Sequence, residues 1–296
     1  MQPQTISAMV AALKNFLSLI KFSHTVFALP FALIGFFMGI QAKSGAMSWQ
    51  LFIAVLACMV FARSAAMAFN RLVDRRFDLA NPRTNKREIP AGIITPNSAL
   101  LFVVINCCLF IVTTFFINTI CFYLSPVALL VVLGYSFTKR FTALCHLVLG
   151  IGLSLAPIGA YLAITGQFAF APLLVSFTVL TWVSGFDIIY ALQDEEFDRS
   201  NQLHSIPAFM GVKRALHLST LLHIISAFLI ILLGYFHSFH LYYWIGAILF
   251  ASLLIYQHSL VKPTDLSKVN LAFATTNGIG SVLFASFVIA DILFTH

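Results

Sequence analysis

Acidic residues recur at four-residue intervals in two separate segments of the sequence. The first segment places Asn70, Asp74 and Asp78 in register, and the second places Asp194 and Asp198 in register. Residues four apart lie on one face of a helix, so each segment presents its oxygens together. Such oxygens are hard ligands that suit Mg²⁺, which commonly binds one or two carboxylates together with substrate phosphates. The pattern predicts Mg²⁺ ions, one at each carboxylate pair, that clamp a diphosphate.

The two segments are separated by a constant interval. Asp74 and Asp194 are 120 residues apart, and so are Asp78 and Asp198. One such pair is typical of a solvated helix end, but like charges at this spacing destabilise a helix by roughly a few tenths of a kcal/mol. Two matching pairs therefore indicate a parallel internal repeat that carries a functional site.

Basic and hydroxyl side chains that can bind a diphosphate flank these segments. Arginine offers phosphate oxygens a planar fork, and lysine offers a point charge. The predicted diphosphate contacts are Lys21, Arg75, Arg83, Arg87, Tyr135, Ser136 and Lys139. For the arginines of the loop after Asp78, an open alternative is that they only set the topology and neutralise lipid headgroups.

Arg63 lies within an apolar run, on the helix face that also carries Asn70 and Asp74. A charge inside a membrane is costly and indicates function. We therefore predict that Arg63, with His24 and Tyr190, binds an acidic group of a second substrate. The alternatives are a structural ion pair with Asp187, extension of Arg63 to the membrane surface, and a packing role for His24.

Asp187 is similarly deep, two helical turns before the second carboxylate pair. We predict a catalytic group of Asp74, Asp187 and Asp194. In this group, Asp187 or one of the paired aspartates removes a proton from the second substrate.

The elements that position these groups are predicted to be membrane helices. Hydrophobic residues make up 60% of the 296 residues, charged residues 9%, and the mean hydropathy is +0.95. A soluble domain is about one quarter charged, so these values exclude a water-soluble enzyme and, despite the net charge of +7, a nucleic-acid-binding domain. They predict an all-α integral membrane protein, a single domain over residues 1–296, with nine transmembrane helices around a central cavity that opens near the cytoplasmic face. The nine predicted spans are Phe22–Ile40, Leu51–Phe69, Ala99–Ile117, Ile120–Gly134, Leu144–Ile164, Pro172–Ala191, Ala215–Tyr235, Leu241–Leu260 and Val269–Phe294.

The distribution of charge predicts the orientation. With nine spans, 15 of the 17 Lys and Arg residues fall on the side of the N-terminus. The positive-inside rule places that side in the cytoplasm. Nine of the ten acidic residues fall on the same side. The positive-inside rule concerns basic residues and does not explain why the acidic residues gather on this side. We therefore expect that they belong to an active site that faces the cytoplasm.

Three motifs resemble those of the UbiA-type membrane prenyltransferases. They are NRLVDRRFD with the downstream NPRTNKREIPAG, FDIIYALQDEEFD, and YSFTKR at the end of the fourth span. The resemblance covers nearly the whole chain and implies a nine-helix bundle that transfers a polyprenyl chain from its diphosphate to an aromatic ring, with Mg²⁺. It implies a metal site of Asn70, Asp74, Asp78, Asp194 and Asp198. It implies diphosphate contacts at Arg75, Tyr135, Ser136 and Lys139.

The motifs depart from the family pattern at Arg71, where many members have Asp, and at Ile89, where many have Arg. The stretch from Asp198 to Pro207 is similar to a branch of bacterial and archaeal members usually labelled 4-hydroxybenzoate polyprenyltransferases. We therefore expect polyprenyl transfer to a 4-hydroxybenzoate-like acid in quinone biosynthesis, in a bacterial inner membrane. The expected partners are polyprenyl diphosphate, the aromatic acid and membrane lipid, without an obligate protein partner. The alternatives are prenylation of a naphthoate in menaquinone biosynthesis and, in a different class, a secondary transporter.

Overall fold

The secondary structure is almost entirely helical in the computed structural model, which describes residues 14–20, 28–45 and 47–295. Within these described residues, eight helices are long and apolar enough to cross a membrane, and α2 (Leu29–Ala42) is a shorter apolar helix. Backbone groups in lipid must pair within their own segment, which is why apolar runs form helices. The predicted all-α integral membrane protein is confirmed. The predicted first span, Phe22–Ile40, begins outside the described residues, so the count of nine stays a prediction.

The long helices match the predicted apolar runs, with ends that differ by a few residues. They are α3 (Trp49–Val73), α5 (Pro96–Ile117), α6 (Thr119–Thr138), α7 (Cys145–Thr165), α8 (Phe170–Ala191), α11 (Val212–Phe236), α12 (Leu241–Leu260) and α13 (Asn277–Phe294). A π-helical segment, Leu271–Thr276, leads directly into α13.

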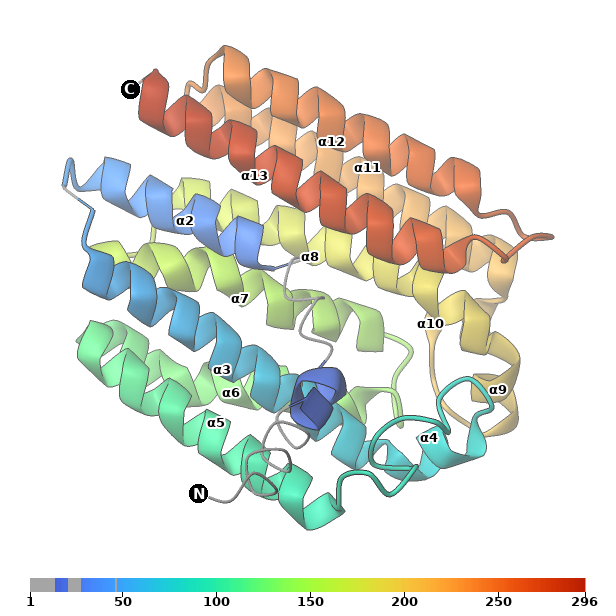
Figure 1. Ribbon diagram of the computed structural model, residues 1–296. Coiled ribbons are helices and arrows are strands. Elements are labelled where there is room, and N and C mark those ends of the chain that lie inside the picture. The colour runs from blue at the N-terminus through green and yellow to red at the C-terminus, as the bar shows by residue number, and fades with distance from the viewer. Residues whose placement is uncertain (1–13, 21–27, 46, 296) are drawn as a thin grey trace.

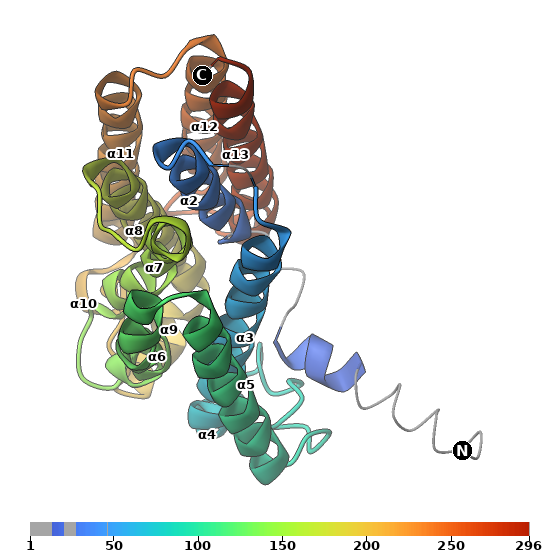
Figure 2. The same ribbon diagram turned by 90° about the vertical axis from the view of Figure 1, so that its left-hand side faces the viewer.

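The helices form one bundle in which α7 and α8 are central. Helix α7 packs against α2, α6 and α8, and α8 packs against α11. Figure 2 shows α11, α12 and α13 together on one side of the bundle and α5 and α6 on the other. The short helices α4 (Arg75–Ala80), α9 (Glu195–Ser200) and α10 (Ile206–Met210) lie together at one end of the bundle (Figure 1).

A glycine brings α7 and α8 into close contact. A Cβ atom at Gly150 would lie 2.6 Å from the carbonyl oxygen of Leu180 and 2.4 Å from Oγ of Ser184. Real Cβ atoms do not approach so closely, so a larger residue would push the two helices apart. This contact fixes the register between the start of α7 and the end of α8, where charged side chains meet.

Asp291 joins α13 to α12 at the opposite end of the bundle. Its buried carboxylate accepts hydrogen bonds from the backbone N–H of His240 at 2.8 Å and of Tyr243 at 3.1 Å. It therefore satisfies N–H groups that the first turn of α12 leaves without partners.

We expect Asp291→Ala to lower the free energy of unfolding by about 1–3 kcal/mol, because buried N–H groups lose a charged acceptor. Thermal unfolding in detergent micelles would measure the effect as a lower Tm. Asp291→Asn keeps one acceptor oxygen and should lose less. An unchanged Tm for Asp291→Ala would contradict this role.

Candidate active site

The two acidic segments end their membrane helices in the same way. Asp74 follows α3 and Asp194 follows α8 through a 3₁₀ turn, and each occupies the N-cap position of a six-residue helix. Neither carboxylate caps its helix by a side-chain hydrogen bond, so both remain available to other partners. The two short helices begin 120 residues apart in the chain, which supports the predicted internal repeat.

The loop after the first segment binds the second segment directly. Asn81 donates from Nδ2 to Oδ1 of Asp194 at 3.0 Å. Arg83 donates from Nε to the same oxygen at 3.0 Å, and its Nη2 forms an ion pair with Oδ2. Nη1 of Arg83 also donates to the hydroxyl of Tyr190 at 3.0 Å. The ends of α3 and α8 therefore meet on one side of the bundle.

Asp74 lies among both signs of charge. Nδ2 of Asn70 donates to its Oδ2 at 3.1 Å, and Arg140 lies 3.6 Å from its Oδ1. Burial, together with the nearby Asp78 carboxylate, raises the pKa of Asp74 to about 6. A cation bound beside this carboxyl group would favour its charged form.

The inner carboxylates, Asp78 and Asp198, are buried and each faces a basic side chain. Nη1 of Arg87 donates to Oδ1 of Asp78 at 2.6 Å. Nζ of Lys139 lies 2.7 Å from Oδ1 of Asp198. Burial tends to lower the pKa of Lys139, but the Asp198 carboxylate outweighs it and holds that pKa above its usual value. The site thus holds acidic and basic groups in matched pairs.

The carboxylate and amide oxygens of the two acidic segments fit a divalent cation that also binds the phosphate oxygens of a substrate. Oδ2 of Asp78 is buried without a hydrogen-bond partner in the described part of the chain, and Nη1 of Arg71 lies 4.0 Å from it. Within that same part, no three His, Cys, Asp or Glu side chains converge closely enough to enclose a metal ion by themselves. Mg²⁺ suits such open sites, because it typically takes one or two carboxylates and completes its shell with water and substrate phosphates.

An apolar cavity of about 380 Å³ lies between α3, α5, α6 and α7. On α3 its lining runs from Val55 to Met67, which is roughly 18 Å of helix. Its remaining walls are mostly aliphatic and aromatic, and they reach Ile117 and Phe168 at the end away from the carboxylates. A cavity of this shape suits a hydrocarbon chain.

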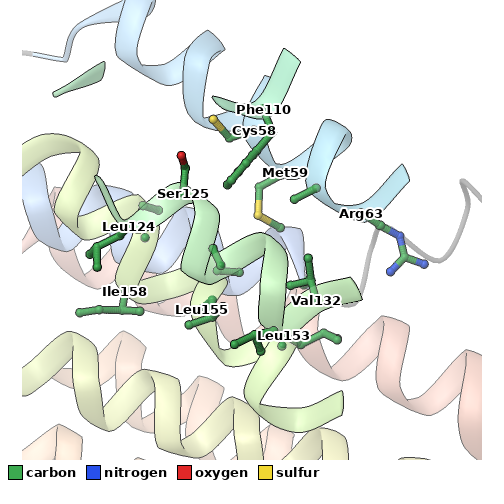
Figure 3. Close-up of a pocket in the computed structure, with 18 of the residues that line it drawn as sticks. Cys58, Met59, Arg63, Phe110, Leu124, Ser125, Val132, Leu153, Leu155 and Ile158 are labelled. Carbon is green, nitrogen blue, oxygen red and sulfur yellow. The ribbon is translucent and has the colours of Figure 1, made fainter. Parts of the chain in front are cut away.

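Arg63 and Tyr135 give the cavity its polar end. Figure 3 shows the guanidinium of Arg63 on one side of the cavity, with Cys58 and Ser125 on the other. Nε of Arg63 is buried and has no hydrogen-bond partner among the described residues. Arg63 precedes Asn70 by seven residues, so it lies roughly 10 Å below Asn70 along α3. A guanidinium with a buried donor that lacks a partner is expected to bind an anion.

Some of the predicted site residues lie apart from the cavity. None of the five predicted metal ligands lines the cavity, whose lining ends with Met67 on α3 and Tyr135 on α6. Arg75 donates to the carbonyl oxygen of Leu72 at 2.7 Å, and Ser136 is buried but does not line the cavity. The diphosphate roles of Arg75 and Ser136 therefore remain predictions.

The alternative ion pair between Arg63 and Asp187 does not form. Asp187 instead bonds to His146, with 2.7 Å between Oδ2 and Nδ1. Lys21 and His24, predicted for the diphosphate and the acceptor, lie outside the described residues.

Three residues of the site were missed by the sequence analysis as specific contacts: Asn81, Arg140 and His146. Asn81 is the first residue of the motif NPRTNKREIPAG and Arg140 the last residue of YSFTKR, so the motifs themselves are the signal that points to them. His146 carries no such signal, because its partners Asp187 and Ile206 are 41 and 60 residues away in the chain.

Comparison with known proteins agrees with this fold. The model of the UbiA prenyltransferase family matches residues 28–287. The 4-hydroxybenzoate octaprenyltransferase of Tolumonas auensis is 31% identical over 249 residues, which cover 84% of this chain and 87% of that protein. The enzyme of the same name from Pasteurella multocida is 31% identical over 231 residues, which cover 78% and 79%.

Solved structures share the architecture. The apo structure of a UbiA homolog from Aeropyrum pernix K1 has a TM-score of 0.82 and 30% identity, covering 91% of this chain and 98% of that one. A UbiA homolog from Archaeoglobus fulgidus, bound to GPP and Mg²⁺, has a TM-score of 0.72 and 25% identity, covering 94% and 99%.

The fold and the comparisons therefore define a class, the membrane-embedded prenyltransferases. Within that class, the chain belongs to the UbiA prenyltransferase family. It is a polyprenyltransferase.

Proposed function

We propose that this protein transfers a polyprenyl group from its diphosphate to the ring of 4-hydroxybenzoate or a closely similar aromatic acid. The reaction belongs to quinone biosynthesis, uses Mg²⁺, and takes place in a bacterial inner membrane with the site facing the cytoplasm. The bundle has nine spans. The relatives named 4-hydroxybenzoate octaprenyltransferase support the acceptor, and the neighbour bound to GPP and Mg²⁺ supports the donor and the ion.

The observation that carries the proposal is the contact of Arg83 and Asn81 with Asp194. This contact joins the loop after the first acidic segment to the second segment, and an apolar cavity that Arg63 and Tyr135 line lies deeper in the bundle. A diphosphate fits the charged layer, a polyprenyl chain fits the cavity, and a carboxylate on the acceptor fits Arg63.

On the donor side, the chain binds the diphosphate through its basic side chains. Lys139, Arg83 and Arg87, which pair with carboxylates in the structure, bind the diphosphate oxygens, with Arg75, Tyr135, Ser136 and Lys21 as further contacts. The divalent ion, when bound by Asn70 and the four paired aspartates, supplies positive charge that stabilises the departing diphosphate. The C–O bond then breaks to leave an allylic cation, and the apolar cavity keeps water away from it.

On the acceptor side, Arg63 binds the carboxylate of the aromatic acid, with Tyr190 and His24 beside the ring. The ring carbon next to the phenolic hydroxyl attacks the cation and forms the new C–C bond. Asp187 accepts the proton that this carbon loses. The tail remains in the bilayer throughout, because moving it into water costs about 0.8 kcal/mol per CH₂ group.

Incubation of the purified protein with a polyprenyl diphosphate, Mg²⁺ and a panel of hydroxybenzoates and naphthoates tests the proposal by mass spectrometry. We expect a product whose mass is the hydroxybenzoate plus the prenyl group. Prenylation of the naphthoates alone would assign the chain to menaquinone biosynthesis instead. Saturable binding without covalent product would contradict the proposal and favour transport.

The cavity wall offers a test of where the polyprenyl chain lies. Gly159 lines the cavity, and a Cβ atom there would meet nothing within 4 Å. Gly159→Leu should therefore fill part of the cavity and lower kcat/KM for a long polyprenyl diphosphate by about tenfold or more, the effect of an overpacked site. A five-carbon donor should be much less affected.

The matched control is Gly134→Leu. Gly134 is also helical and also has open space around its Cβ position, but it does not line the cavity. Equal losses for the long and the short donor in Gly159→Leu would place the polyprenyl chain elsewhere.

A further inference from the structure

A hydrogen-bonded histidine and aspartate lie beside the carboxylate segments but belong to neither. His146, the second residue of α7, is buried, and its Nδ1 lies 2.7 Å from Oδ2 of Asp187 on α8. Nε2 of the same ring lies 3.3 Å from the backbone nitrogen of Ile206, at the start of α10. One imidazole therefore joins three elements: α7, α8 and the segment that follows the second acidic motif.

The partners of the ring determine where its proton lies. The backbone N–H of Ile206 can only donate, so Nε2 of His146 must carry a lone pair. The proton of the neutral ring is then on Nδ1, which donates it to Asp187. This assignment follows from the hydrogen bonds on both sides of the ring. One oxygen of Asp187 is consequently committed to His146.

Further hydrogen bonds hold the segments on both sides of His146 in place. The N–H of His204 donates to the carbonyl oxygen of Lys139 at 2.7 Å, and Sγ of Cys145 donates to the carbonyl oxygen of His204 at 3.5 Å. These bonds hold the segment before Ile206 against the connection between α6 and α7. Oγ of Ser184 also donates to the backbone carbonyl of His146 at 3.2 Å.

The carboxylate of Asp187 is more exposed than the ring that it bonds. The Asp187 side chain is 22% exposed, whereas the His146 side chain is 4% exposed. Asp187 precedes Asp194 by seven residues, roughly 10 Å of helix, and Arg63 precedes Asn70 by the same number on α3. Asp187 therefore lies, like Arg63, deeper in the bundle than the paired aspartates that are proposed to bind the ion.

We propose that His146 is a positioning residue that holds Asp187 so that its free oxygen, Oδ1, accepts the ring proton. The inference rests on the proposed function. In this step the C–H bond of the alkylated ring carbon breaks, its electron pair restores the aromatic ring, and the proton passes to Oδ1. The donor's C–O electron pair has already left with the diphosphate, so no further reactant is needed.

Two substitutions of His146 separate positioning from packing. His146→Leu removes the bond to Asp187, and we expect kcat to fall by about 10- to 100-fold, the loss typical of a misplaced reacting group. The KM for the prenyl diphosphate should not change. His146→Asn places an amide nitrogen where Nδ1 stood, so it keeps a donor to Asp187 and should recover most of the lost kcat.

The decisive readout is the rate ratio between unlabelled and ring-deuterated acceptor. If His146 positions the proton acceptor, deprotonation becomes slower in His146→Leu and the ratio rises above that of the native protein. The control His258→Asn changes another partly buried histidine, which bonds to His223; it should leave the ratio unchanged. A ratio in His146→Leu equal to that of the native protein, or no recovery in His146→Asn, would overturn the inference. Failure of the native protein to prenylate any aromatic acid would instead overturn the proposed function.

Discussion

Asp194→Asn is expected to reduce prenyl transfer by about 10²- to 10³-fold. Asp194 accepts hydrogen bonds from Asn81 and Arg83, and it is one of the carboxylates proposed to bind the divalent ion. The substitution keeps the shape of the side chain but removes its charge, so both the ion site and the junction of the two segments weaken. The measurement is kcat at saturating donor and acceptor, together with the Mg²⁺ concentration that gives half-maximal rate.

Asp74→Asn should behave in the same way, since Asp74 holds the equivalent position in the first segment. Glu196→Gln is the matched control. Glu196 is exposed on the same short helix as Asp198, so its loss of charge should leave the rate unchanged. Substantial transfer by Asp194→Asn at ordinary Mg²⁺ concentrations would remove the carboxylate pairs from the mechanism.

Arg63→Ala is expected to raise the KM for the aromatic acid by about 10- to 100-fold, because a charged hydrogen bond contributes about 1.5–3 kcal/mol. The KM for the prenyl diphosphate should change little, since Arg63 lies below the carboxylate layer at the polar end of the cavity. Steady-state kinetics with each substrate varied in turn measures the difference.

Arg63→Lys keeps the charge but loses the planar fork, so its acceptor KM should be intermediate. Arg214→Ala, at an exposed position near the start of α11, controls for a general loss of positive charge. If both substrates lose affinity equally in Arg63→Ala, the role of Arg63 is structural.

Much of the fold and of the main site follows from the sequence, because both depend on local periodicity. Apolar runs determine where membrane helices lie, and the four-residue spacing of Asp74 and Asp78 survives in the structure. The backbone N–H of Asp78 still bonds to the carbonyl of Asp74 at 2.8 Å, although α3 itself ends at Val73. The constant interval of 120 residues likewise corresponds to two matching short helices.

What the sequence could not provide depends on contacts between distant segments. The pairing of His146 with Asp187 and Ile206 requires the register of α7 against α8, which packing around Gly150 determines. The hydrogen bond from Nε1 of Trp182 to Oδ1 of Asn277, the residue that follows the π-helical segment, is a further example. It is 3.2 Å long and crosses the bundle, and no local sequence pattern predicts it. Tertiary geometry, rather than residue type, decides these details.

Mn²⁺ offers the most direct test of the central claim that both acidic segments bind one diphosphate through divalent ions. The experiment is X-ray anomalous scattering from crystals grown with Mn²⁺ and an unreactive prenyl diphosphate analogue. We expect anomalous peaks beside Asp74 and Asp78 and beside Asp194 and Asp198, with the diphosphate between them and its tail in the cavity lined by Gly159. Peaks away from these carboxylates, or a diphosphate in contact with only one segment, would contradict the account.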